Sequence, residues 1–257
     1  MKRNQDQDFK RIVSIINKVT DFNLDHYKIK PLRRRIHSRM RRLGIDNYED
    51  YTNYLATNKN EVTILEEALT INLTRFFRNK AVFEYIKDEI LPSLNNPSIW
   101  SAGCASGAEP FTLAILCHEQ NLNCSIVGTD IDTESIKKAR EGIYDIFSMK
   151  EVEPDIQNKY FKKVGKNYKI IDKIKERVKF QQLDLKDISF GSGFDLIICR
   201  NVLIYLSREF QEQTLLCFHK ALKPRGYLIL GKVESLVGQA KELFNTLNLK
   251  NRIYDKR

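Results

Sequence analysis

The chain has 257 residues, 42% of them apolar and 30% charged, which is typical of a globular protein with one large domain and a smaller one. No apolar run reaches the roughly 18 residues of a membrane-spanning helix, and the polar N-terminus has no signal-peptide core, so we expect a cytoplasmic protein without membrane insertion. The net charge of +10 predicts an acidic partner, while five cysteines without a C-x-x-C pair and four scattered histidines predict reduced thiols and no metal site.

Residues 1–70 are predicted to form a small helical domain. Pro31 suits the first turn of a helix and Gly44 the residue after its end, so one helix is expected between them. Asp46 and Glu49 fit a capping box at the start of the next helix. The first helix is indicated by apolar residues at helical spacing, namely Phe9, Ile12, Val13, Ile16 and Val19.

From residue 98 onward, short apolar runs alternate with segments of helix length. This pattern predicts an α/β fold, in which helices cover both faces of a parallel sheet. The interval at about 150–182 differs, because its short alternations around a turn at 165–167 predict a small antiparallel β insert. The expected strands are SIWSA, CSIVGTD, RVKFQQLDL, FDLIICR and GYLILG.

Open α/β sheets bind ligands at the carboxyl ends of their strands, so polar residues there are the candidate contacts. After the first strand, Gly103 and Gly107 allow a ligand to approach the backbone, and Glu109 begins the helix that follows. The second strand ends at Asp130, where a carboxylate can accept hydrogen bonds from ribose hydroxyls. Each acid also has a purely structural interpretation as a helix cap.

Two further strand ends carry polar residues. Asp184 and Leu185 follow the third strand, where the carboxylate either accepts from an adenine amino group or belongs to a simple turn. Arg200 and Asn201 follow the fourth strand and bring a guanidinium and an amide to the mouth of the crevice. Tyr205 lies one helical turn after Asn201 and either faces the crevice or packs in the core.

The first loop distinguishes between two cofactors that contain adenosine. A pyrophosphate requires glycines and an uncharged helix N-terminus, so Glu109 would repel NAD. The ammonium and sulfonium groups of S-adenosylmethionine are cations, which Glu109 would attract. The sequence therefore predicts S-adenosyl-L-methionine as cofactor, with S-adenosyl-L-homocysteine as product, and argues against an NAD-dependent oxidoreductase.

Four stretches together resemble the bacterial chemotaxis receptor methyltransferases of the CheR type. They are LTINLTRFFRN, IWSAGCASGAEPFTLAI, IVGTDIDTESIKKAREGIY and FDLIICRNVLIYL, in an order and spacing that agree with that family. The resemblance covers nearly the whole chain. It implies an all-α N-terminal domain over 1–70 and a Rossmann-like S-adenosylmethionine-dependent methyltransferase domain over 71–257. The family commonly has Gly-Glu-Glu-Pro where this chain has Gly-Ala-Glu-Pro, so only Ala108 departs from the pattern.

The resemblance also implies a reaction, the methylation of glutamate side-chain carboxylates on the cytoplasmic helices of chemotaxis receptors. Such a carboxylate is already ionised at neutral pH, so no strong general base is needed. The catalytic roles would belong to Arg78, which holds the carboxylate or the closing segment, and to Tyr205, which orients the reacting groups. The implied cofactor-binding residues are Asn72, Thr74, Arg78, Ala102, Gly103, Glu109, Asp130, Asp184, Leu185, Arg200 and Asn201.

The segment from Lys28 to Ile45 contains eight Lys or Arg residues and no acid. Its apolar stripe is Leu32, Ile36, Met40 and Leu43. Such a run is ordinarily a solvated face, but uncompensated cations repel one another, and we predict a docking surface for acidic receptor helices. We expect a monomer and no nucleic-acid partner. The predicted docking residues are Arg33, Arg34, Arg35, Arg39, Arg41 and Arg42.

Two alternatives would use the same features. An RNA methyltransferase would also exploit the positive charge, but the chain lacks the Asn/Asp-Pro-Pro-aromatic stretch of enzymes that methylate exocyclic amines, and it shows no aromatic-rich RNA platform. A non-catalytic adaptor would bind the cofactor and the receptor but transfer no methyl group. The short loop around Gly165 predicts that the insert does not bind a receptor's C-terminal peptide.

Overall fold

The computed structural model describes residues 2–19, 27–69, 74–185 and 191–257. The chain forms two compact units. The helical unit comprises Met1–Asn72 together with Tyr205–Phe210, and the sheet unit comprises Leu73–Ile204 and Gln211–Arg257. The sequence did not predict that the short segment 205–210 would group with the helices.

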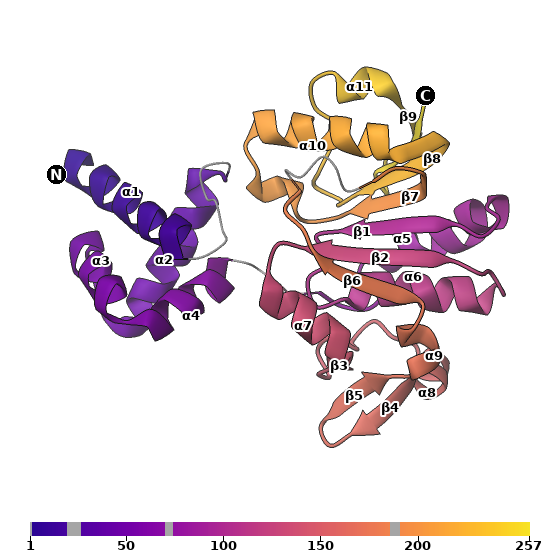
Figure 1. Ribbon diagram of the computed structural model, residues 1–257, viewed down its shortest axis with the longest axis horizontal. Helices are drawn as coiled ribbons and strands as arrows, with labels where there is room; N and C mark the ends of the chain where they lie inside the picture. The colour runs from indigo at the N-terminus through magenta and orange to yellow at the C-terminus, as the bar shows by residue number, and fades with distance from the viewer. Residues whose placement is uncertain (1, 20–26, 70–73, 186–190) are drawn as a thin grey trace. The chain divides into compact units, whose positions relative to one another are not determined.

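The helical unit contains α1 (Lys2–Val19), α2 (Ile29–Leu43), α3 (Tyr48–Thr57) and α4 (Lys59–Leu69), shown in indigo and violet in Figure 1. Helix α2 ends at Gly44, whose φ of 69° is the left-handed conformation that glycine tolerates best. The N-cap of α3 is Asn47, whose side chain accepts from the Asp50 N–H at 2.9 Å, so the predicted capping box at Asp46 was wrong by one residue. The core of the helical unit is built from apolar residues at helical spacing, including Phe9, Ile12, Ile16, Leu32, Ile36, Met40, Tyr51, Leu55 and Leu65.

The sheet unit is built on a seven-stranded sheet in the order β6-β2-β1-β7-β8-β10-β9 (Figure 1). The strands from β6 to β8 pair in parallel, which confirms the predicted α/β fold, while β10 pairs antiparallel with both β8 and β9. The last two strands were not predicted from the sequence. The strand bounds are β1 (Ser98–Ala102), β2 (Ser125–Asp130), β6 (Val178–Gln182), β7 (Phe194–Cys199), β8 (Leu222–Leu230), β9 (Phe244–Asn248) and β10 (Ile253–Lys256).

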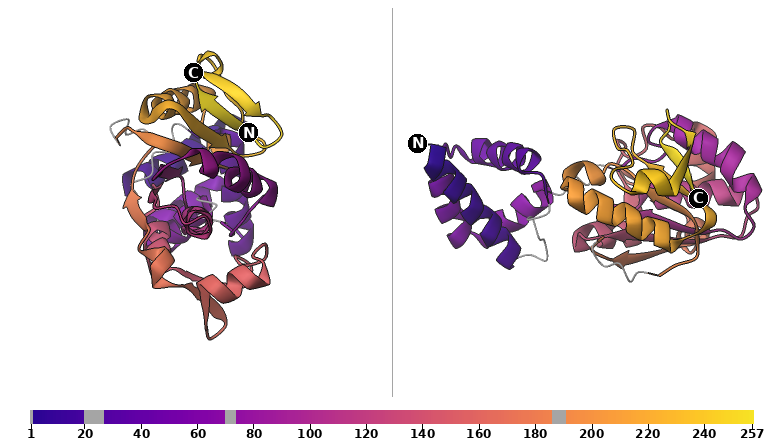
Figure 2. Two further views of the ribbon diagram at one scale, coloured as in Figure 1. Left: turned by 90° about the vertical axis from the view of Figure 1, so that its right-hand side faces the viewer. Right: turned by 90° about the horizontal axis from the view of Figure 1, so that it is seen from above.

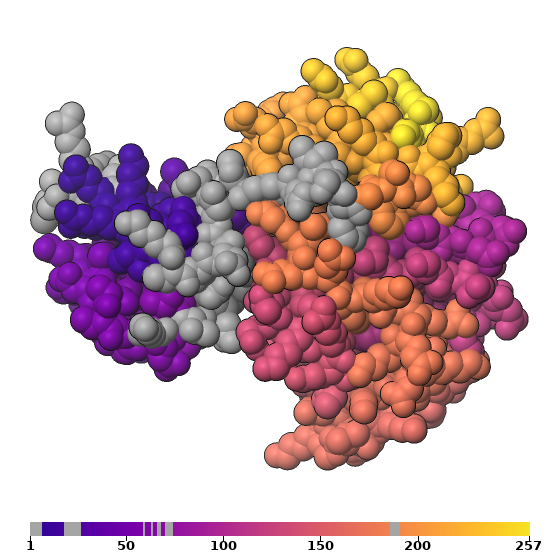
Figure 3. Space-filling view, viewed as in Figure 1, coloured from indigo at the N-terminus to yellow at the C-terminus, as the bar shows by residue number. Residues whose placement is uncertain are grey.

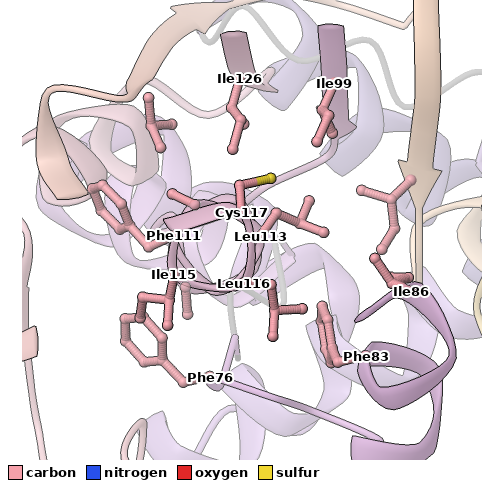
Figure 4. Close-up of a cluster of buried hydrophobic side chains, with 14 of the residues drawn as sticks. Phe76, Phe83, Ile86, Ile99, Phe111, Leu113, Ile115, Leu116, Cys117 and Ile126 are labelled. Carbon is pink, nitrogen blue, oxygen red and sulfur yellow. The ribbon is translucent and has the colours of Figure 1, made fainter. Parts of the chain in front are cut away.

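Helices pack on both faces of this sheet. On one face, Ile99 of β1 and Ile126 of β2 point at α6, and Phe76 and Phe83 lie on the far side of that helix (Figure 4). Helix α6 is apolar almost all round, which is why it is buried. On the other face, Trp100 makes an edge-to-face contact with Phe218 at a centroid distance of 5.2 Å. The helices are α5 (Lys80–Tyr85), α6 (Ala108–Glu119), α7 (Thr133–Glu141), α10 (Arg208–Ala221) and α11 (Ala240–Leu243), with a π-helical turn (Ile86–Ile90) and 3-10 turns (Leu91–Ser93, Leu203–Tyr205).

The predicted antiparallel insert is confirmed as a second sheet in the order β3-β5-β4, although its bounds differ from the prediction. It starts earlier, at β3 (Ile143–Tyr144), and β6 belongs to the large sheet because it pairs in parallel with β2. The β4–β5 hairpin stands at the end of the sheet unit opposite β9 and β10 (Figures 1, 2 and 3). After β3, the insert contains α8 (Pro154–Tyr160), β4 (Phe161–Val164), β5 (Asn167–Ile170) and α9 (Asp172–Lys175). None of the helices in the described ranges is both long and apolar enough to span a bilayer.

Candidate active site

The loop between β1 and α6 is held against the end of β2. The backbone N–H groups of Gly103 and Cys104 donate to the carbonyl oxygen of Thr129 at 2.8 and 2.9 Å. Ala102, the last residue of β1, is fully buried. These bonds bring the ends of the two strands together, as the sequence predicted for a ligand-binding edge.

The two glycines of this loop are required by the protein itself. Gly103 and Gly107 have φ values of 74° and 86°, in the left-handed region. A Cβ at Gly103 would overlap the side chain of Val202, and one at Gly107 would lie 2.9 Å from both Ala139 and Phe180. Packing of the loop alone accounts for both glycines, and the close approach of a ligand that the sequence predicts here stays a prediction.

Asp130 connects the loop to the turn after β2. One carboxylate oxygen accepts from the Ala105 N–H at 2.8 Å, and the other accepts from the Asp132 N–H at 3.0 Å. The cap of α7 is Asp132, which accepts from the Glu134 N–H at 3.1 Å, so Asp130 is not the helix cap. Burial raises the pKa of Asp130, and the backbone hydrogen bonds oppose that rise. Three backbone hydrogen bonds leave at least one of the roughly four lone pairs of this carboxylate to accept from a ligand hydroxyl.

Glu109 does not cap helix α6, because the cap position is Gly107 and no side chain caps it. One oxygen of Glu109 accepts from the Ser101 hydroxyl at 2.9 Å, and the other pairs with Nη1 of Arg200 at 3.2 Å. Burial raises the pKa of Glu109, while the charges of Arg200 and Arg78 and the Ser101 hydrogen bond lower it. Glu109 is therefore a half-buried acid that contacts residues of β1 and of the end of β7.

Arg200 connects the end of β7 to the segment ahead of α5. Its side chain is only 3% exposed, and Nη2 donates at 2.7 Å both to the carbonyl oxygen of Arg78 and to Oδ1 of Asn79. Its Nε has no hydrogen-bond partner among the described residues. A buried donor without an acceptor is costly in a folded protein, which points to a ligand acceptor at this position.

The other predicted cofactor residues have different placements. Thr74 and Arg78 are half-buried, whereas Asn72 lies outside the described residues. Asp184 and Leu185 are half-buried just beyond β6, beside the end of β2, because the Leu183 N–H donates to the carbonyl oxygen of Asp130 at 2.9 Å. Asn201 follows β7 with a φ of 64°, a left-handed conformation that asparagine tolerates better than most residues.

Glu234 is a buried acid at this edge that was not predicted from the sequence. It follows β8, is 4% exposed, and accepts from the N–H groups of Asn201 and Ile204 at 2.9 and 3.2 Å. The only signal in the sequence is an acid shortly after the strand GYLILG. Burial and the charges of Glu234, Glu109 and Asp130 raise the pKa of the Cys199 thiol, so three carboxylates surround the end of β7.

This donor set fits S-adenosylmethionine. Glu109 could hold the methionyl ammonium with its carboxylate, and the unpartnered Nε of Arg200 could donate to the methionyl carboxylate. Asp130 supplies acceptors at the position where ribose hydroxyls bind in this class of fold. The half-buried carboxylates of Glu109 and Asp130 outnumber the guanidinium of Arg200 at this edge, which favours a cationic cofactor over a pyrophosphate.

Three of the six predicted docking arginines of α2 are exposed, and the other three contact side chains within the helical unit. Arg34, Arg41 and Arg42 are exposed, and we call these three the basic face. Arg39 instead pairs with the buried Glu61 through two hydrogen bonds of 3.0 and 2.6 Å, and the Tyr51 hydroxyl donates to the same carboxylate at 2.9 Å.

The remaining two arginines of α2 lie over aromatic rings. Cζ of Arg33 is 4.8 Å from the centre of the Phe9 ring. Arg35 is 8% exposed, and its Cζ is 4.4 Å from the centre of the Tyr205 ring. The carbonyl oxygen of Tyr205 also accepts from the Lys28 N–H at 2.8 Å. The contacts of Tyr205 within the helical unit were not predicted from the sequence.

Comparison with known proteins gives matches over both parts of the chain. Residues 7–70 match the CheR methyltransferase all-alpha domain, and residues 72–253 match the CheR methyltransferase SAM binding domain.

Curated relatives are similar over most of their length. A chemotaxis protein methyltransferase of Borreliella burgdorferi is 30% identical over 248 residues, covering 89% of this chain and 88% of the relative. That of Salmonella typhimurium is 31% identical over 92% of this chain and 86% of the relative. Chemotaxis protein methyltransferase 1 of Pseudomonas aeruginosa is 34% identical over 79% of this chain and 80% of the relative.

Proposed function

This chain belongs to the CheR methyltransferase family, and we propose that it methylates glutamate side-chain carboxylates on the cytoplasmic helices of chemotaxis receptors. The observation that carries the proposal is the ion pair of the half-buried Glu109 with the buried Arg200, near Asp130 at the shared edge of β1, β2 and β7. This set of acids and a guanidinium suits the zwitterionic end and the ribose of S-adenosyl-L-methionine. The names of the relatives point to chemotaxis receptors as the substrates.

S-adenosyl-L-methionine, when bound, supplies an electrophilic methyl group on a sulfonium. Glu109 would hold the methionyl ammonium, Nε of Arg200 the methionyl carboxylate, and Asp130 the ribose hydroxyls. Thr74, Asp184 and Leu185, with Asn72, complete the proposed cofactor contacts around the strand ends.

The substrate carboxylate needs little activation, because the pKa of a free glutamate is about 4.3 and the group is ionised at neutral pH. The task of the protein is therefore to align the oxygen with the methyl group and to exclude water. We assign Arg78 to hold the substrate carboxylate. Tyr205 orients the reacting groups through its hydroxyl, and the guanidinium of Arg35 restrains the Tyr205 ring.

The basic face, made of Arg34, Arg41 and Arg42, would dock acidic receptor helices. Arg39 is not expected to contribute directly, because its charge is already paired with Glu61 inside the helical unit. Docking through exposed charges raises the association rate and makes it dependent on salt. We expect the protein to act as a monomer in the cytoplasm.

The proposal is tested with methyl-labelled S-adenosylmethionine and a purified receptor cytoplasmic fragment. We expect label on the fragment that alkali releases as methanol, the behaviour of a carboxyl methyl ester. Tyr205→Phe keeps the ring beside Arg35 but removes the hydroxyl, so kcat should fall while cofactor affinity stays near the wild-type value. Glu134→Gln, a change of an exposed acid in the first turn of α7, serves as the control and should behave as wild type. Alkali-stable label on RNA would instead identify an RNA methyltransferase, and cofactor binding without transfer would identify an adaptor.

A further inference from the structure

The carboxylate of Glu234 is bound by backbone N–H groups, most of them in the turn that follows β7. Its Oε2 accepts from the N–H groups of Asn201 at 2.9 Å and Gly231 at 2.6 Å, while Oε1 accepts from the N–H of Ile204 at 3.2 Å. Burial raises the pKa of Glu234, and backbone hydrogen bonds from these three residues and from Leu203 oppose the rise. One carboxylate thus accepts from three backbone N–H groups of the turn 201–204, those of Asn201, Leu203 and Ile204, and from that of Gly231.

The surrounding backbone is shaped to admit this carboxylate. A Cβ at Gly231 would overlap Oε2 of Glu234 and lie 2.8 Å from the backbone nitrogen of Asn201, so only glycine fits there. Asn201 itself has a left-handed φ of 64°. A non-glycine residue in that region persists only where its surroundings over-determine it, and here the N–H bond to Glu234 does so.

The turn 201–204 connects two parts of the proposed machinery. Asn201 begins it, one residue after Arg200, whose guanidinium pairs with Glu109. Val202 fills the space above Gly103, so the turn also packs on the first cofactor loop. A shift of this turn would therefore disturb Asn201, the neighbouring Arg200 and the first cofactor loop together.

We propose that Glu234 is a positioning residue for methyl transfer, acting through the turn 201–204, three of whose backbone N–H groups it binds along with that of Gly231. The proposed role involves no contact of Glu234 with the reacting atoms. The role rests on the proposed function, because it presumes that Arg200 and Asn201 hold the cofactor in the geometry of methyl transfer. A hydrogen-bonding framework of this kind tunes rate through geometry, and a misplacement of about 1 Å can cost roughly 100-fold.

The test compares Glu234→Gln with the wild type and with Glu242→Gln, which changes an exposed acid on α11. Glutamine keeps the size of the side chain but puts an NH2 group against backbone donors, so at least one N–H loses its acceptor. We expect kcat on the receptor fragment to fall about 10- to 100-fold. The dissociation constant for S-adenosylhomocysteine should rise by less than kcat falls, at full binding stoichiometry, because Glu109 and Asp130 keep their own contacts, and Glu242→Gln should match the wild type.

Amide hydrogen exchange gives a readout that does not depend on turnover. The peptide spanning 200–206 should exchange faster in Glu234→Gln than in the wild type, while the strand β1 keeps its protection. If Glu234→Gln does not fold, Glu234→Asp is measured in the same way, since its shorter side chain cannot reach all four donors.

The outcomes separate the two proposals. A wild type that binds the cofactor but methylates no receptor would refute the proposed function, and exchange in 200–206 would then still decide whether Glu234 holds the turn. Unchanged exchange in that peptide refutes the role of Glu234. Unchanged kcat refutes it too, as does a loss of cofactor affinity as large as the loss in kcat.

Discussion

The pair of Glu109 and Arg200 can be tested by the substitution Glu109→Gln. Glutamine keeps an oxygen that accepts from Ser101, but it presents an NH2 group to Nη1 of Arg200, which is also a donor. The substitution therefore removes the charge of the half-buried acid while its shape is almost unchanged.

The magnitude follows from the contacts that remain. Arg200 is 3% exposed but retains two neutral acceptors at 2.7 Å, the carbonyl oxygen of Arg78 and Oδ1 of Asn79. Because the guanidinium is not left without partners, we expect a loss of about 1.5–3 kcal/mol in the free energy of unfolding, the range for a hydrogen bond to a charged group. The same range for the lost contact with the methionyl ammonium corresponds to a rise of roughly 10- to 100-fold in the dissociation constant of the cofactor.

The assay is calorimetric titration with S-adenosylhomocysteine, together with urea unfolding of the unliganded protein. Glu134→Gln is the matched control, because it also removes an acid from the first turn of a helix but lies exposed on α7. A dissociation constant for Glu109→Gln within threefold of the wild-type value would refute the assignment of Glu109 to the cofactor.

Other predictions concern pH, stability and docking. Because burial raises the pKa of Glu109 and of Asp130, both should take up protons above the ordinary range of about 4, and cofactor affinity measured by calorimetry should fall as pH drops from 7; a flat profile would contradict this. The stability of the unliganded fold should depend on pH in the opposite direction. The stabilisation from the raised pKa values of these two acids is fully present below about pH 4, and it is lost as pH rises through those raised pKa values. Glu61→Gln should destabilise the helical unit by about 3–5 kcal/mol, whereas the exposed control Glu49→Gln should change the unfolding free energy by less than about 0.5 kcal/mol. Arg34→Glu should raise KM for the receptor fragment without changing cofactor affinity, and wild-type turnover at low receptor concentration should fall steeply between low and physiological salt; equal KM values at both salt concentrations would remove the docking role.

The grouping of polar residues at one edge of the sheet was largely predictable because strand ends are visible in the sequence. Asp130 and Arg200 directly follow apolar runs, and parallel strands bring such residues to one edge. Glu234 also follows a strand, but its role depends on backbone N–H groups of a turn some thirty residues earlier in the chain, which no local pattern reports.

The burial of Arg35 and Arg39 in α2 could be predicted only in part from the sequence. Arg35 and Arg39 each lie three residues after a member of the apolar stripe, so helical geometry puts them at its border. Whether a border residue faces solvent depends on what packs there. The partner of Arg39 is Glu61 on α4, and that of Arg35 is Tyr205 from far along the chain, and both are tertiary contacts without a sequence signature.

The C-terminal strands illustrate the same limit for the fold. Strand β9 reads FNTLN, which has neither a continuous apolar run nor a full alternation, and its exposed residues outnumber its buried one. Its position at the edge of the sheet explains this composition, because an edge strand packs less side-chain area than a central one.

The proposed reaction is decided by finding which atom of the substrate receives the methyl group. Wild-type protein, S-adenosylmethionine and a receptor cytoplasmic fragment are incubated, and the fragment is sequenced by tandem mass spectrometry. We expect a mass increase of one CH2 unit on glutamate side chains of the fragment, removed by mild alkali. An unmodified fragment in the presence of bound cofactor, or an alkali-stable methyl group on a different side chain or on RNA, would contradict the proposed reaction.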